Sequence, residues 1–225
     1  MSDKQIPAWE RLLSSAAHLQ RLVPDAVLVG GTAAAIYAHH RISIDHDHTL
    51  GDLRSRFDEI LAELESVAGW KTARVRRPVL VLGSLDGIET GIRQLVREEP
   101  LETTEVEVDG VRLKVPTKEE MFRIKAILVL KRNATRDYLD LSALGQLLGD
   151  EGVRRALMRF DELYPQSNGA SALQQLANQL ADPLPYDLDD TNLAEYKHLS
   201  TEFQDWNHVR SICAHLAVDI IHGML

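Results

Sequence analysis

The sequence predicts an α+β protein in two parts, a mixed or antiparallel sheet with its helices followed by a helical bundle. A short apolar strand, a glycine turn, a helix and a further strand open the pattern. Strand signals then continue to about residue 115, and Asp109-Gly110 between the last two is a strong hairpin signal. From Thr117 onward the repeating segments have helical spacing. We therefore expect a first domain over residues 1–115 and a second over residues 116–225.

In the first half, apolar residues three to four positions apart predict helices, and alternating apolar and polar residues predict strands. The expected helices span residues 8–22 and 32–40, and a third begins at Leu53 and ends before Gly69. The expected strands span residues 26–29, 41–47, 71–76, 79–83, 88–95, 102–108 and 111–115.

The second half opens with a helix start signal. Thr117-Lys118-Glu119-Glu120 matches a capping box, in which the first side chain accepts a hydrogen bond from a main-chain N–H of the first turn. Further helices are expected over residues 136–148, 152–163, 171–180, 193–199 and 203–222, with a proline-containing loop over residues 181–190.

The composition is that of an ordinary globular protein, with 44% hydrophobic and 26% charged residues and a net charge of −9. The sequence has no apolar run of the roughly 18 residues that a membrane span requires, and no apolar secretory signal. A single cysteine, Cys213, excludes an internal disulfide and suits a reducing compartment. We therefore expect a cytoplasmic protein without a membrane segment.

The acidic net charge also limits the partners. A polyanion such as nucleic acid would be repelled unless a local basic patch or bridging cations receive it. The basic clusters that could serve are Arg74, Arg76 and Arg77, and separately Lys131, Arg132 and Arg136.

The clearest chemical signal is a pair of carboxylates on the strand after the glycine turn. Asp45 and Asp47 are two residues apart, so in an extended strand they share a face about 6.8 Å apart. They can converge on one divalent cation or on a pair. Glycines in Gly30-Gly31-Thr32 let main-chain N–H groups approach an anion at the start of the next helix. A phosphate cradle beside a divalent metal suits the transfer of a phosphoryl or nucleotidyl group.

This arrangement resembles the nucleotidyltransferase superfamily with the DNA polymerase beta palm, and within it the AbiEii-type toxins. The opening motif of that family is Gly-Gly-Thr/Ser, a helix, an Arg and a strand ending in Asp-x-Asp. It is matched by Gly30-Gly31-Thr32, Arg41, Ser43, Asp45 and Asp47. The second motif is a helix with a Lys, then an Arg, then Arg/Lys-Asp and Asp-Leu. It is matched by Lys125, Arg132, Arg136-Asp137 and Asp140-Leu141. The resemblance covers residues 27–50 and 117–148 and implies a minimal nucleotidyltransferase palm followed by a helical domain.

The resemblance also implies an activity and a first set of site residues. The protein would be a Mg²⁺-dependent enzyme that moves a nucleoside monophosphate from an NTP to a hydroxyl acceptor. Asp45 and Asp47 would be catalytic and would hold Mg²⁺ or Mn²⁺. Gly30, Gly31 and Thr32 would hold the phosphates of the nucleotide.

The second motif and the toxin branch imply further residues and partners. Lys125 would contact the triphosphate, and Asp137 would complete the catalytic site from the helical domain. Both lie on successive expected helices, so their meeting requires a tight turn near Asn133. RNA, a protein or a small molecule could be the acceptor. A toxin would also have a cognate antitoxin as partner, which could occlude the site in a stoichiometric complex.

Two features depart from the family pattern. His46 and His48 stand at positions that are usually apolar, and His46 would point away from the catalytic face toward the core. Many polymerase-like enzymes also carry a third carboxylate on a later strand, and the aligned position here is Gly91. Glu89 shares its face and could substitute only after a two-residue shift in register. Without a third acid, the alternative is a catalytically impaired nucleotide-binding or regulatory protein on the same scaffold.

Several of these residues also have a structural interpretation. Lys125 lies among apolar residues, so it could be a snorkelling lysine on a buried helix. Asp137 could cap the next helix, where aspartate is favoured, and Asp140 is better explained as structural.

Histidines offer a different metal site. His39, His40, His46 and His48 lie close to the acid pair and could bind zinc or manganese. Alternation along the strand argues against this, because two of the histidines face away from the carboxylates. The C-terminal residues Trp206, His208, Cys213, His215 and His222 show no ligand-like spacing and are expected to be packing and surface residues.

Overall fold

The computed structural model describes residues 9–223. Residues 1–8, where the sequence predicts no secretory signal and the start of the first helix, and residues 224–225 lie outside that range. The chain forms two compact units. The first comprises the chain up to Ile36 together with Ile42–Pro116, and the second comprises Tyr37–Arg41 together with the chain from Thr117. The division therefore differs from the expected one, because a short segment of the first half belongs to the second unit.

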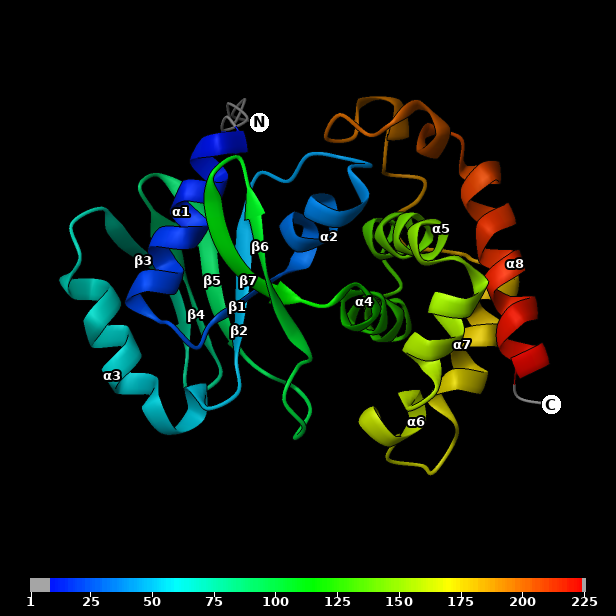
Figure 1. The fold of residues 1–225 in the computed structure, drawn as a ribbon, viewed down its shortest axis with the longest axis horizontal. Coiled ribbons are helices and arrows are strands. Elements are labelled where there is room, and N and C mark those ends of the chain that lie inside the picture. The colour runs from blue at the N-terminus through cyan, green and yellow to red at the C-terminus, as the bar shows by residue number, and fades with distance from the viewer. Residues whose placement is uncertain (1–8, 224–225) are drawn as a thin grey trace. The chain divides into compact units, whose positions relative to one another are not determined.

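The first unit is built around a five-stranded sheet with the order β1-β2-β5-β4-β3 (Figure 1). Its strands are β1 (Val27–Val29), β2 (His46–Leu50), β3 (Trp70–Arg76), β4 (Leu80–Leu85) and β5 (Ile88–Gln94). β2 and β5 are parallel, and the other neighbouring pairs are antiparallel. This mixed sheet, followed by a helical second unit, is the α+β fold that the sequence predicts.

Two helices cover one face of this sheet (Figure 1). The helices of the first unit are α1 (Trp9–Leu22), α2 (Gly30–Ala38) and α3 (Leu53–Ser66). Leu19 of α1, Ile60 of α3 and Ile92 of β5 are fully buried in one hydrophobic cluster. Because side chains alternate along a strand, His46 of β2 points into this core, whereas Asp47 points to the opposite face.

The expected strand over residues 41–47 is wrong in its first part, because β2 begins only at His46. The main-chain oxygen of Asp45 accepts hydrogen bonds from the hydroxyls of Thr32 at 2.5 Å and Ser43 at 3.2 Å. These two hydrogen bonds hold the segment before the strand in a non-extended conformation. The β-branched residues of the segment, taken alone, predict a strand instead. Asp45 therefore lies one residue before the strand, and only the second carboxylate is fixed by the sheet register.

A separate hairpin completes the first unit. It consists of β6 (Thr103–Val108) and β7 (Val111–Pro116), as the sequence predicts. Asp109 and Gly110 at its turn have φ values of 51° and 76°. Two successive left-handed residues define the type I′ turn, whose twist matches that of the flanking strands.

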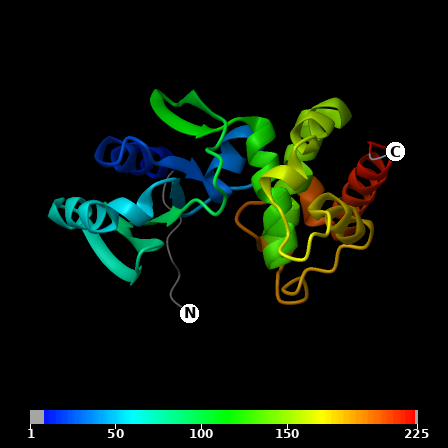
Figure 2. The ribbon, with the colours of Figure 1, turned by 90° about the horizontal axis from the view of Figure 1, so that it is seen from below.

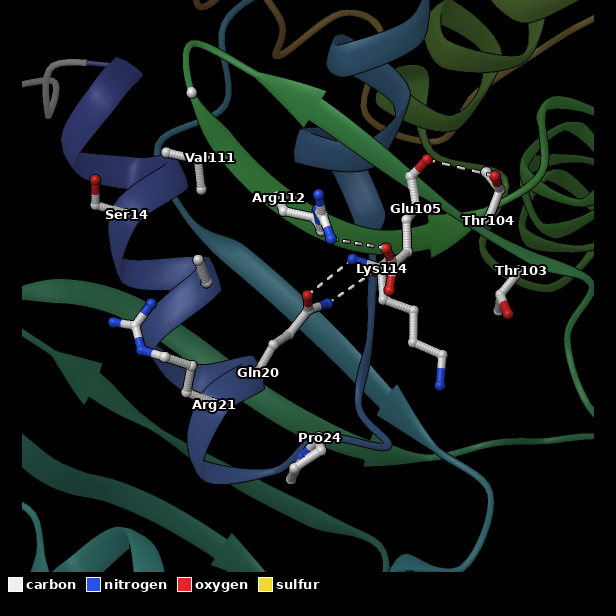
Figure 3. Close-up of a pocket in the computed structure, with 12 residues that line it drawn as sticks. Ser14, Gln20, Arg21, Pro24, Thr103, Thr104, Glu105, Val111, Arg112 and Lys114 are labelled. Carbon is white, nitrogen blue, oxygen red and sulfur yellow. Dashed lines mark hydrogen bonds and ion pairs between the residues drawn. The ribbon is translucent and has the colours of Figure 1, made fainter.

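The hairpin lies beside α1 in both views of the molecule (Figures 1 and 2). The side-chain amide of Gln20 donates to the carbonyl of Lys114 at 2.8 Å and accepts from its N–H at 2.9 Å (Figure 3). Gln20 thus satisfies the main chain of β7 as a neighbouring strand would. A groove of about 880 Å³ runs between α1 and the hairpin, and the acid pair does not line it.

The second unit is helical. Its helices are α4 (Lys118–Arg132), α5 (Thr135–Leu157), α6 (Phe160–Leu163), α7 (Ala172–Ala181) and α8 (Trp206–Gly223), with 3-10 turns at Leu193–Glu195 and Thr201–Gln204. The predicted cap is confirmed, because the Thr117 hydroxyl accepts from the N–H of Glu120 at 3.2 Å. None of the helices between residues 9 and 223 is long and apolar enough to cross a lipid bilayer.

Two helix predictions in this unit need correction. The helices expected over 136–148 and 152–163 are largely one helix, α5, with a kink at Gly149. The helix expected over 193–199 is wrong, since only a single 3-10 turn forms there. Lys197 and His198 have φ values of 45° and 51°, which turn the chain out of helical geometry.

Candidate active site

The acidic face of the first unit centres on Asp47 and the glycine turn. A Cβ placed on Gly30 would lie 3.4 Å from the Cβ of Asp47 and 3.5 Å from its Oδ2. Gly30 also has a φ of 76°, a conformation that L side chains rarely adopt. The turn can therefore approach the carboxylate only as glycine. The predicted proximity of this carboxylate to the start of α2 is confirmed.

Asp45 is held in place by its neighbours. The Ser43 hydroxyl donates to its Oδ1 at 3.1 Å, and the Thr32 hydroxyl binds its carbonyl. Thr32 is 1% exposed, so in this structure its hydroxyl binds the main chain of Asp45 and does not face solvent. A phosphate at the helix start would then meet main-chain N–H groups of the first turn, which have no intrahelical acceptor.

The carboxylate of Asp47 is partly accessible and has Arg93 as a cationic neighbour. Its side chain is 34% exposed, and Nε of Arg93 lies 3.7 Å from its Oδ1. At this distance and exposure the pair is a weak interaction, since such surface ion pairs contribute about 0–1 kcal/mol. A divalent cation can therefore displace Arg93 at small cost.

The histidines of β2 belong to the core, as alternation predicts. The two ring nitrogens of His46 lie 3.0 Å from the Ser15 hydroxyl and 2.9 Å from the Thr90 hydroxyl. Burial lowers the pKa of His46 to about 4, with the Asp45 charge opposing the shift. Burial and then His46 hold the pKa of His48 well below its usual value. Both rings are neutral at pH 7 and face away from the carboxylates, so they do not form the alternative metal site with them.

The usual place of a third carboxylate is crowded by its neighbours on β4. The parallel register pairs Asp47 with Gly91. A Cβ on Gly91 would lie 2.4 Å from Cδ2 of Leu82 and 3.0 Å from the carbonyl of Val81. The parallel pairing begins at His46 with Thr90, so Glu89 lies two residues before the partner of Asp47 on β5.

A buried ionic cluster lies in the second unit, centred on Asp140. This carboxylate is bound by Nε and Nη2 of Arg41 at 2.7 and 2.9 Å, by Nε2 of His40 at 2.7 Å, and by Nζ of Lys125 at 2.6 Å. Burial alone would raise the pKa of Asp140, but Arg41, Lys125 and His40 together hold it well below its usual range. The cluster explains why Tyr37–Arg41 belongs to the second unit.

Lys125 and Asp137 meet as the sequence predicts. Nζ of Lys125 lies 3.5 Å from Oδ1 of Asp137, and Asn133 makes the tight turn between their helices with a φ of 48°. The lysine does not snorkel, because it is 3% exposed and its ammonium binds Asp140. Asp137 does not cap α5, whose N-cap residue is Ala134.

The structure thus brings together several of the predicted site residues. Gly30 and Asp47 meet in the first unit, as do Thr32 and Asp45, and Lys125 and Asp137 meet in the second. Sequence reasoning missed the role of His40 and Arg41 around Asp140. The match of Arg41 to the opening motif indicated that this residue has a role. Its partner Asp140, however, is about a hundred residues away in the chain.

With the fold and this acidic site described, the chain can be compared with proteins of known structure. The chain is similar in structure to JHP933 from Helicobacter pylori, with a TM-score of 0.54, 15% identity and coverage of 98% of this chain and 93% of that one. A second H. pylori structure, of a protein assigned as a nucleotidyltransferase, has a TM-score of 0.55 at 15% identity, covering 97% and 96%. At this identity the likeness shows the fold.

Curated sequences give a different set of relatives. The chain is 29% identical over 231 residues to the heme uptake protein MmpL11 of Mycobacterium tuberculosis, covering 93% of this chain and 22% of that protein. It is 31% identical over 128 residues to the mycolic acid-containing lipids exporter MmpL11 of Mycolicibacterium smegmatis, covering 56% and 13%. The chain thus spans about a fifth of the first relative's length. No protein-family model matches the chain.

Proposed function

We propose that the protein is a nucleotidyltransferase that moves a nucleoside monophosphate from an NTP to a hydroxyl acceptor with the help of Mg²⁺ or Mn²⁺. The observation that carries this proposal is the position of the Asp47 carboxylate against the left-handed Gly30. It sets an accessible acid beside a helix start from which a side chain is excluded. Asp45, whose carboxylate accepts a hydrogen bond from Ser43, would supply the second carboxylate from two residues earlier in the chain.

The residues present fit a hard divalent cation, because carboxylate oxygens together with substrate phosphates are the ligands that Mg²⁺ prefers. Asp45 and Asp47 would hold the ion, which would neutralise charge on the phosphates as pyrophosphate leaves. The main chain at Gly30, Gly31 and Thr32 would bind phosphate oxygens. Thr32 would also keep Asp45 oriented through its carbonyl.

Lys125 and Asp137 are proposed to serve the same reaction from the second unit. Lys125 would bind the triphosphate, which requires its ammonium to exchange a carboxylate partner for a phosphate oxygen. Arg41 would then still neutralise Asp140. Asp137 would provide the further acidic group of the site.

The identity of the hydroxyl acceptor is also a matter of proposal. RNA and a protein side chain both offer hydroxyl groups, and a toxin role with a cognate antitoxin follows from the same resemblance. With a net charge of −9, an RNA acceptor would need bridging cations or one of the basic clusters.

A second candidate is a nucleotide-binding or regulatory protein with impaired catalysis. Gly91 favours it, because Leu82 and the Val81 carbonyl crowd the position of a third acid beside Asp47. The similarity of most of the chain to one part of transport proteins is compatible with such a regulatory role. This candidate binds NTP without releasing pyrophosphate.

The test is incubation of the full chain with each α-³²P-labelled NTP, Mg²⁺ or Mn²⁺, and total RNA or cell lysate. The proposal expects one class of acceptor to become labelled, and expects Asp47→Asn to lower the rate by at least about a hundredfold. The matched control is Asp25→Asn, an exposed aspartate of the same unit, which should keep the parent's rate. Equal labelling by Asp47→Asn and the parent would contradict the proposal, and NTP binding without labelling would favour the second candidate.

A further inference from the structure

A group of three metal-type side chains lies in the second unit, away from every residue assigned above. Asp150, His215 and Asp219 each offer a ligand atom, and these atoms all lie within 4.8 Å of one another. Nε2 of His215 is 3.2 Å from Oδ1 of Asp150 and 3.4 Å from Oδ2 of Asp219. Among residues 9–223 this is the one such group of three.

Two tightly packed helices hold these side chains. His215 and Asp219 are one helical turn apart on α8, so they share a face. Asp150 follows the kink of α5 at Gly149, where φ is 63°. One turn before the kink, a Cβ on Gly145 would lie 3.3 Å from both terminal methyl groups of Leu216. The helices therefore approach closely beside the three ligands, which favours a preformed site.

The spacing of the ligand atoms suits a small divalent ion. For ligands about 2.0–2.2 Å from a tetrahedral Zn²⁺, neighbouring ligand atoms are roughly 3.3–3.6 Å apart. The two measured separations from the His215 nitrogen are 3.2 and 3.4 Å. The remaining separation, between the ligand oxygens of the two aspartates, is within 4.8 Å.

The environment of the three groups also favours a ligand. Oδ2 of Asp219 is shielded from solvent and lies 3.4 Å from Nε2 of His215. The side chains of Asp150 and His215 are 59% and 61% exposed, so an ion can enter from solvent. It would then reach the carboxylate of Asp219, whose side chain is 17% exposed.

We propose that Asp150, His215 and Asp219 form a binding site for a divalent transition-metal ion of the zinc type. One imidazole and two carboxylates favour Zn²⁺, Mn²⁺ or Co²⁺ over Mg²⁺ and Ca²⁺, which prefer oxygen ligands alone. Three protein ligands leave at least one position for water. The bound ion joins α5 to α8 and stabilises the second unit. The site does not depend on the proposed transferase activity.

The experiment measures Zn²⁺ binding by calorimetry on the full chain carrying Asp45→Asn and Asp47→Asn, which removes the other carboxylate pair. We expect one equivalent of Zn²⁺ to bind this parent and to raise its melting temperature. Adding His215→Ala should weaken binding at least tenfold, and Asp219→Asn should also weaken it. The matched control is His222→Ala, an exposed histidine of the same helix.

A second readout identifies the coordination. Co²⁺ bound to the parent should give a visible d–d absorption band that His215→Ala loses and His222→Ala keeps. If the parent binds no Zn²⁺, or if His215→Ala binds it as tightly as the parent, the proposal is overturned. Should His215→Ala lose its helical circular dichroism, Asp150→Asn at the exposed end of the site replaces it in the same comparison.

Discussion

The carboxylate of Asp47 lies against Gly30, whose Cβ position would be 3.5 Å from Oδ2 of the acid. This contact joins the strand that carries an acid to the start of a helix. It also explains why the turn is glycine, since φ at this residue is 76°. The chemistry proposed for the protein depends on this relationship.

Replacing Gly30 by Ala should therefore disturb both stability and the site. An L residue in the left-handed region costs about 1–2 kcal/mol. The added methyl would also come into van der Waals contact with Asp47, 3.4 Å from its Cβ and 3.5 Å from its Oδ2. The matched control is Gly87→Ala, where φ is 80° but nothing lies within 4 Å of the added Cβ. Urea unfolding should show a similar loss in the free energy of unfolding for both variants. Binding of Mn²⁺ and NTP should be lost only in Gly30→Ala. Equal binding by the two variants would argue against a site at the turn.

Removing the charge of Asp140 should strongly destabilise the protein. Asp140→Asn leaves Arg41 and Lys125 buried without their carboxylate, and breaking a buried ion pair costs about 3–5 kcal/mol. The control Asp182→Asn breaks an exposed pair with Arg210 and should change the free energy of unfolding by less than about 1 kcal/mol. Urea unfolding at neutral pH measures both. A loss no larger than the control's would show that the cluster is not a stabilising element.

The contribution of Asp140 to the free energy of unfolding should decrease at low pH. Because its pKa is depressed in the folded state, its contribution is complete above the ordinary pKa of an aspartate. It is lost only as the pH falls below about 4 toward the folded pKa. The stability difference between the parent and Asp140→Asn should therefore be constant from neutral pH to mildly acidic pH and should shrink below that.

As the pH falls, the buried His46 should begin to destabilise the protein at a higher pH than Asp140 does. Its folded pKa of about 4 lies below the 6.5 of an ordinary histidine, so the unfolded chain takes up a proton first. The free energy of unfolding should fall between these two values, by roughly 3 kcal/mol at most. His48 shifts in the same direction and adds to the effect. Urea unfolding at several pH values should show a shallower decline for His46→Leu, and an unchanged slope would mean that His46 is protonated in the folded state.

Restoring the third acid at position 91 should fail without a second change. In Gly91→Asp the new Cβ would meet Cδ2 of Leu82 at 2.4 Å, and overpacking of this kind costs about 1–3 kcal/mol. Adding Leu82→Ala removes that neighbour and should recover part of the stability. Thermal unfolding of the two variants checks this, and the double variant tests by labelled-NTP transfer whether a third acid raises the rate. A Gly91→Asp variant as stable as the parent would contradict this prediction and show that Leu82 makes room at little cost.

Local signals in the sequence predicted much of the fold. Asp109-Gly110 predicted the hairpin and Thr117 the cap of α4, because both depend on residues within one turn. The position of Asp47 beside the glycine turn was also readable, because strand alternation is local, but Asp45 precedes the strand. A mixed or antiparallel sheet was expected, but not its strand order, which pairs β2 with the distant β5.

Features that depend on distant residues could not be predicted. Asp45 lies outside β2 because the hydroxyl of Thr32 binds its carbonyl, a contact made only in the folded chain. The partner of Arg41 is Asp140, and the intervening sequence gives no indication of that pair. The group of Asp150, His215 and Asp219 was missed for the same reason, although the one-turn spacing of the last two on α8 was visible.

The central claim is that Asp45 and Asp47 hold a divalent cation beside the glycine turn. Its most direct test is a Mn²⁺ titration followed by electron paramagnetic resonance, on a chain carrying His215→Ala so that the second candidate site is silent. The account predicts that ATP increases the amount of bound Mn²⁺, and that Asp47→Asn abolishes this increase whereas Asp25→Asn does not. Undiminished ATP-dependent Mn²⁺ binding by Asp47→Asn would contradict it.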